Sequence, residues 1–178
     1  EHIEPLVAVA LHDLLVKKTK QNLGTDSLVA QGKQFVDSAP KYWETYRVLG
    51  DIYSSLGETI KSIELIEQAI LVCPLAEKFS LSRLHYFLSI KLLKLDEDRA
   101  AQAAEMAVQF NECSETLLQQ GRCLTYLRKH NDAHLILEKA LHSAESQQAI
   151  FHIAVAMLRN LRRRSQELEG CDRFEAAR

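Results

Sequence analysis

The chain has 178 residues, of which 47% are apolar and 26% are charged, a composition typical of a globular domain with a sizeable core. Lys and Arg number 22 against 24 Asp and Glu, and the resulting net charge of −2 argues against a domain devoted to binding nucleic acid. Six Gly and three Pro are few for a many-turned β-sandwich and favour helices joined by short loops. The longest purely apolar runs, such as Leu6 to Leu11, have six residues, whereas a membrane-spanning helix needs about 20, so we expect no membrane span.

The four cysteines give no sign of a zinc site. None of them, Cys73, Cys113, Cys123 or Cys171, belongs to a CxxC pair or has a histidine at zinc-finger spacing. Two disulfides are conceivable, but free thiols packed as small apolar groups fit the pattern better. Free thiols favour a reducing compartment, and we therefore expect a cytoplasmic protein.

Apolar residues recur at helical spacing along the whole chain, and no stretch alternates with the period of a strand. The first predicted helix covers Ile3 to Lys20 and ends at Gly24, and Asp26 or Ser27 caps a second one that ends before Pro40. The remaining predicted helices are, in order, residues 41–56, 58–72, 77–94, a helix from the turn at 95–98 to Phe110, residues 114–128, a helix capped by Asn131 or Asp132 after the turn at 129–132, and a last helix from Ser146 to Leu168, stopped by Gly170.

Two prolines, Pro40 and Pro74, lie 34 residues apart and enclose the clearest pattern in the chain. The segment between them begins at Trp43 and reads Tyr46-x2-Leu49-Gly50-x2-Tyr53, Gly57, Ser62-x3-Ile66-x2-Ala69. This pattern resembles the tetratricopeptide repeat (TPR), a pair of antiparallel helices, A and B, that buries its apolar face against neighbouring pairs. Small residues such as Gly50 and Ala69 would let the helices approach closely.

Two weaker units follow at nearly the same period. One starts near Leu81 and carries Ala100-x3-Ala104-x2-Ala107, and the other carries Leu117-x2-Gln120-Gly121-x2-Leu124 and Ala133-x3-Leu137-x2-Ala140. The resemblance implies an all-α fold, a right-handed TPR-like superhelix, whereas the alternative is a generic helical bundle. We predict one helical repeat domain over residues 1–178, with a degenerate repeat or helix pair at 1–42, repeats at 43–76, 81–113 and 114–147, and a capping helix and tail at 148–178.

In the TPR family the A helices line a concave groove that binds an extended peptide or a partner helix. The matching positions give a polar candidate set for partner binding: Glu44, Arg47, Asp51, Ser54, His85, Ser89, Arg122, Tyr126, His152 and Arg159. The arginines among them could each hold a carboxylate by two hydrogen bonds. Asp51 would repel a carboxylate at a position where TPR co-chaperones carry asparagine, which argues against a chaperone carboxylate clamp.

Enzyme signatures are missing, since the sequence contains no GxSxG, no GxxxxGK[ST] and no GxGxxG motif. We therefore predict no catalytic residue and no cofactor. The stripe His130, His134, Glu138 and His142 has metal-ligand spacing, but His130 falls in a predicted turn, so a solvated helix face is favoured and no metal site is predicted. The four arginines within residues 159–164 have acids after them and no interleaved aromatics, which favours a salt-bridged helix over a nucleic-acid site.

Taken together, these patterns predict a noncatalytic protein–protein interaction module with an adaptor, assembly or targeting role. The partner would be a protein or peptide held in the groove. Two alternatives stay open. The chain could be a regulatory or substrate-recruiting arm of a larger enzyme, or a self-assembling scaffold in which the last helix or the Leu6 to Leu15 face docks another copy.

Overall fold

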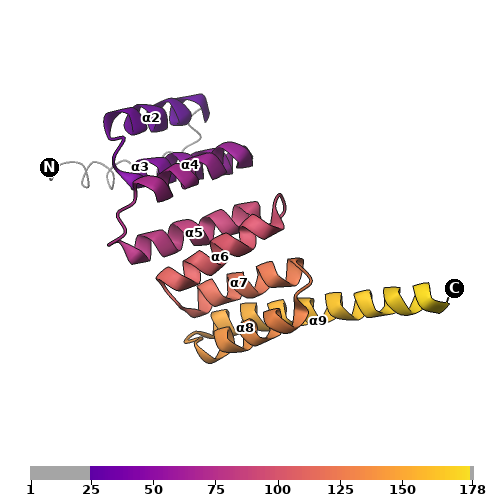
Figure 1. Ribbon diagram of the computed structural model, residues 1–178. Helices are drawn as coiled ribbons and strands as arrows, with labels where there is room; N and C mark the ends of the chain where they lie inside the picture. Colours follow the sequence, from indigo (N-terminus) through magenta and orange to yellow (C-terminus); the bar gives the residue numbers. More distant parts are fainter. Residues whose placement is uncertain (1–24, 177–178) are drawn as a thin grey trace. The chain divides into compact units, whose positions relative to one another are not determined.

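The computed structural model describes residues 25–176, which form eight α-helices and, within that range, no strand (Figure 1). The predicted all-α fold is thus confirmed, while the predicted helix Ile3 to Lys20 lies outside the described residues. The helices are α2 (Thr25–Ser38), α3 (Trp43–Ser55), α4 (Thr59–Val72), α5 (Lys78–Leu92), α6 (Glu97–Phe110), α7 (Ser114–Tyr126), α8 (His130–His142) and α9 (Gln147–Ala176).

The helices form two compact units, one up to Leu84 and the other from His85 onward, so that the division falls inside α5. The pairs α3–α4, α5–α6 and α7–α8 follow the three predicted repeats, although α5 begins at Lys78, before the predicted boundary at residue 81. The repeat boundaries and the single-domain arrangement stay predictions.

In the first unit, α3 packs against both α2 and α4. Its apolar face supplies most of a buried cluster made of Leu28, Val48, Leu49, Ile52 and Tyr53. A buried hydrogen bond adds to this packing, since the Ser62 hydroxyl on α4 donates to the Gly50 carbonyl on α3 at 2.7 Å. The A and B helices of the first repeat are therefore joined between Gly50 and Ser62, two positions of the predicted repeat pattern.

In the second unit, α7 packs against α6, α8 and α9, and α8 also packs against α9. The core here is made of Leu117, Leu137, Ala140, Ile153 and Ala156. On α6 the buried face consists of four alanines, including the three expected for a B helix, and its members are Ala100, Ala103, Ala104 and Ala107. Small side chains on α6 allow a close approach of the neighbouring helix.

Three predicted helix ends are wrong. Helix α9 runs through Gly170 to Ala176, because a helical glycine costs only about 1 kcal/mol relative to alanine and ends a helix only where the backbone turns left-handed. Helix α8 starts at His130 rather than after Asn131 or Asp132, since the buried His130 side chain is held in place by α9. Helix α2 already includes Thr25, ahead of the predicted caps.

Only one described glycine, Gly57, has a left-handed backbone, with φ of 78°, and it ends α3 as predicted. The corresponding residue after α7 is Arg128, with φ of 60°. The third repeat therefore makes the same turn as the first without a glycine, at some cost in backbone strain.

His85, one of the predicted partner-binding residues, is half-buried in the second unit. Its ring stacks on Phe110 with centroids 5.6 Å apart, and its buried Nδ1 has no hydrogen-bond partner among the described residues. Burial lowers the pKa of His85 below its ordinary value of 6.5, because the charged imidazolium would lose its hydration.

We expect Gly50 and Gly121, which lie between the A and B helices of their repeats, to respond differently to alanine. A Cβ at Gly121 would lie 2.6 Å from the fully buried Leu137 side chain, whereas a Cβ at Gly50 would meet its nearest atom, the Ser62 carbonyl oxygen, at an ordinary 3.4 Å. Gly121→Ala should therefore lower the free energy of unfolding by about 1–3 kcal/mol, and Gly50→Ala should be neutral or stabilising by up to about 1 kcal/mol. Urea denaturation measures both, and equal losses would contradict the difference in packing.

The burial of His85 also predicts a pH dependence. Since its pKa is lower in the folded than in the unfolded chain, the unfolded chain binds more protons just below pH 6.5, and stability is lost as the pH falls through that range. The decrease in Tm between about pH 7 and pH 5 should be smaller for His85→Gln than for the parent chain. The exposed His142 provides the control, and His142→Gln should leave the decrease unchanged.

Candidate functional site

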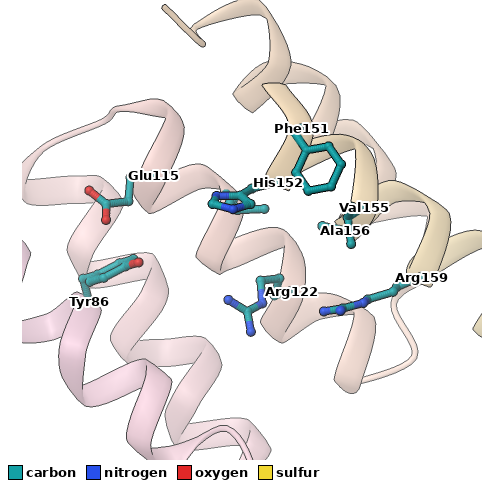
Figure 2. A pocket seen from close by; sticks show the side chains of 9 residues that line it. Tyr86, Glu115, Arg122, Phe151, His152, Val155, Ala156 and Arg159 are labelled. Carbon is teal, nitrogen blue, oxygen red and sulfur yellow. The ribbon is translucent and has the colours of Figure 1, made fainter. Parts of the chain in front are cut away.

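The second unit contains a cavity of about 520 Å³ between its A-type helices, which we call the α7–α9 cavity (Figure 2). Side chains of α5, α7 and α9 line it. They are Tyr86, Glu115, Leu118, Arg122, Phe151, His152, Val155, Ala156 and Arg159. Three of the predicted partner-binding residues, Arg122, His152 and Arg159, are thus brought together from two helices.

One end of the α7–α9 cavity is positively charged. Figure 2 shows the guanidinium groups of Arg122, on α7, and Arg159, on α9, pointing into the same space. Neither guanidinium forms an ion pair with a carboxylate in the part of the chain that the structure describes. Two such groups facing one space repel each other, and an anion placed between them would relieve that repulsion.

The other end carries Tyr86 and Glu115 (Figure 2). Burial, the charge of Glu115 and a hydrogen bond with that carboxylate raise the pKa of Tyr86 to about 12, although the Arg122 charge acts in the opposite direction. The phenol therefore stays protonated at neutral pH. The α7–α9 cavity thus has a basic end and an acidic, hydrogen-bonding end.

An apolar wall completes the α7–α9 cavity. Phe151 is 65% exposed, and Val155 lies one turn further along α9, where it is half-buried. Leu118 on α7 is also half-buried. An exposed aromatic ring beside charged groups is common at surfaces that bind another molecule, because the ring offers contact area at a small cost in entropy.

The buried Asn160 fixes the position of α9 against α7 and α8. Its amide nitrogen donates to the His130 carbonyl at 2.9 Å, and its side-chain oxygen lies 2.7 Å from His130 Nδ1. Because a carboxamide oxygen only accepts, Nδ1 carries the proton in this contact. The Thr125 hydroxyl adds a longer bond of 3.4 Å to the same oxygen, and His130 Nε2 lies 3.1 Å from the Glu167 carboxylate.

Three other predicted site residues of this unit do not line the α7–α9 cavity. His85 stacks on Phe110. Ser89 is fully buried and its hydroxyl donates to the Tyr86 carbonyl at 2.7 Å, so its polar group is used within the helix. The Tyr126 ring is covered by the Arg163 guanidinium, whose carbon lies 4.0 Å from the ring centroid.

The four predicted residues of the first unit lie together on α3. Arg47 pairs with Asp51 at 2.9 Å, so the carboxylate that was expected to repel an anion neutralises its neighbour. Glu44 accepts a hydrogen bond from the Tyr42 hydroxyl at 2.9 Å, and Ser54 is exposed. Of the three arginines expected to hold a carboxylate, Arg47 is therefore already paired, unlike Arg122 and Arg159.

Six residues that line the α7–α9 cavity are missing from the predicted set: Tyr86, Glu115, Leu118, Phe151, Val155 and Ala156. Glu115, Leu118 and Ala156 occupy groove positions that the TPR resemblance names, but they were not chosen. Tyr86 and Phe151 could have been predicted, because each is an aromatic residue next in sequence to a predicted groove position, His85 or His152. The Asn160–His130 contact gave no signal, since it joins residues 30 positions apart.

Other chemistry has little support among the described residues. They contain no group of three His, Cys, Asp or Glu side chains that could hold a metal ion, and the predicted histidine stripe is split, with His134 paired to Glu138 at 3.3 Å while His130 is buried. Cys73, Cys113 and Cys123 are free thiols, and burial raises the pKa of Cys123 to about 12, which makes it unreactive. In the same range no helix is both long and apolar enough to cross a membrane.

Comparison with known proteins shows the fold. No protein-family model matches the sequence, and no curated protein matches it. A thermophilic TPR protein of Thermus thermophilus is similar in structure, with a TM-score of 0.68, 21% identity, and coverage of 85% of this chain and 81% of that one. YrrB, a TPR protein with an unusual peptide-binding site, has a TM-score of 0.65, 17% identity, and coverage of 88% and 80%.

A third similar structure is that of MamA, with a TM-score of 0.63, 16% identity, and coverage of 95% of this chain and 96% of that one. At such identities the likeness concerns the fold and not the function. It agrees with the helix pairs and with the small-residue contacts between Gly50 and Ser62. The chain has the TPR-like fold, a solenoid of antiparallel helix pairs.

Proposed function

We propose that the chain is a noncatalytic protein-interaction module that binds a peptide segment of a partner in the α7–α9 cavity. The observation that carries this proposal is the pair of guanidinium groups, Arg122 and Arg159, which face one space without a carboxylate partner among the described residues. A charged pair that only stabilised the fold would be expected to have acidic partners within the chain.

The two ends of the α7–α9 cavity suggest the chemistry of the peptide. An acidic side chain or a terminal carboxylate would bind between Arg122 and Arg159 by charge-assisted hydrogen bonds. An apolar side chain of the same peptide would pack on Phe151 and Val155, and a backbone N–H could donate to Glu115. This combination of a few polar contacts and one aromatic anchor is typical of peptide recognition.

The fold supports the proposal by analogy only. YrrB, which has the same fold, is a TPR protein with a peptide-binding site, and its identity to this chain is 17%. The α3 residues Glu44, Arg47, Asp51 and Ser54 stay part of the proposal as a polar surface that a partner could contact. The adaptor, assembly or targeting role and the cytoplasmic location also belong to it, the latter because Cys73, Cys113 and Cys123 are free thiols.

The proposal predicts that binding depends on two particular arginines. Peptides selected from a displayed random library on the intact chain should contain an acidic residue next to an apolar one. Arg122→Glu and Arg159→Glu should each lower the affinity for a selected peptide at least tenfold, or by about 1.4 kcal/mol. The reason is that each variant replaces an attraction to the acidic group of the peptide by a repulsion. Isothermal titration calorimetry gives the affinities.

The matched control lies on the same helix. Arg162 is an exposed α9 residue that does not line the α7–α9 cavity, and Arg162→Glu makes the same change in net charge. This control variant should bind the peptide as the parent chain does, and circular dichroism should show that all three variants are folded. An equal loss for Arg159→Glu and Arg162→Glu would mean that net charge, and not the α7–α9 cavity, controls binding.

A further inference from the structure

Helix α9 carries a second apolar face that nothing in the described part of the chain covers. The exposed fraction is 65% for Phe151, 66% for Leu158, 49% for Leu161 and 58% for Leu168. Ala154, on the same face, is also exposed. We call these five residues the α9 stripe. Along the sequence these positions advance alternately by three and four residues, which is the spacing of a coiled-coil seam. Ser165, between Leu161 and Leu168, occupies the one polar position of this series.

The side of α9 that faces the rest of the second unit is a different one. Ile153, Ala156 and Asn160 are buried there. Further along, Arg163 lies over the Tyr126 ring and Glu167 contacts His130. These residues occupy the c and f places of the heptad in which the α9 stripe occupies a and d, so the stripe points away from α7 and α8, except at Phe151, which also lines the α7–α9 cavity.

The length of α9 explains why no B helix of the usual kind covers the stripe. The A helices α3 and α7 have 13 residues each, after which the chain turns back, whereas α9 continues without a break for 30 residues. Figure 1 shows its distal half running past α7 and α8. A projecting half-helix of about 15 residues is marginal in water by itself and gains from a partner.

We propose that a second copy of this chain covers the α9 stripe, and that the two α9 helices form a short parallel coiled coil. In each copy α7 and α8 lie on the far side of α9, which leaves the two stripes free to meet. The 3.5-residue spacing of the stripe favours this pairing over packing against a straight helix, because only supercoiling keeps such a seam in register.

Charge complementarity favours the parallel direction. Arg164 and Glu169 flank the stripe at the g and e places and lie five residues apart, so in a parallel pair Arg164 of each copy faces Glu169 of the other. An antiparallel pair that places Leu158 opposite Leu168 would instead bring the two copies of Arg164 together. Because the parallel pair has two-fold symmetry, the attraction between Arg164 and Glu169 occurs twice, once on each side of the seam.

Sedimentation equilibrium of the intact chain from low to high micromolar concentration tests the proposal. The parent chain should reach a dimer, and Leu161→Glu and Leu168→Glu should each weaken the dimer at least tenfold. The control is Leu135→Glu, which changes a leucine that is 63% exposed on α8, away from the stripe, and should leave the dimer unchanged. A monomer at every concentration, or a dimer indifferent to Leu161→Glu, would overturn the proposal.

The direction of pairing has its own test. Arg164→Glu and Glu169→Arg should each weaken the dimer, since each places like charges opposite each other, and the double variant should restore it. A double variant that dimerises no better than the single ones would overturn the parallel arrangement. None of these substitutions touches a residue lining the α7–α9 cavity, so peptide binding should persist in the monomeric variants, and the two proposals can fail separately.

Discussion

The contact on which the second unit depends most is the buried hydrogen bonding of Asn160. Its carboxamide joins α9 to the start of α8 through the His130 carbonyl and Nδ1, at 2.9 and 2.7 Å. A buried carboxamide left without partners costs about 1–3 kcal/mol, so this pairing is favoured in only one position and rotation of α9. Apolar contacts such as those of Ile153 tolerate small rotations, whereas these hydrogen bonds do not.

The rotation fixed by Asn160 decides what each face of α9 can do. His152 and Arg159 are turned toward α7, where they complete the α7–α9 cavity with Arg122. The opposite side leaves the α9 stripe exposed along the helix. The peptide-binding proposal and the self-association proposal therefore rest on one structural feature while using different residues, apart from Phe151, which belongs to both.

The fold could be predicted from the sequence because its signal is local and repeated. The order of large and small residues around Gly50, Ser62 and Ala69 recurs at a nearly constant period, and each repetition supports the others. The candidate site was predicted only in part. The groove positions of the repeat pattern identified Arg122, His152 and Arg159, but the pattern could not reveal that Arg47 is paired with Asp51 or that Ser89 is buried. Those outcomes depend on helix rotation and on neighbours distant in sequence.

The continuation of α9 through Gly170 was missed for a different reason. A glycine ends a helix only where the backbone after it turns out of the helical conformation.

The placement of α9 by Asn160 is tested most directly by hydrogen exchange, followed by mass spectrometry, in the parent chain and in Asn160→Ala. We expect Asn160→Ala to lose protection along α9 and at the start of α8, while α3 and α4 of the first unit keep theirs. The exposed Asn131 offers a matched control, and Asn131→Ala should exchange as the parent chain does. Unchanged protection of α9 in Asn160→Ala would mean that apolar packing alone positions this helix, and would contradict the central role of the buried carboxamide.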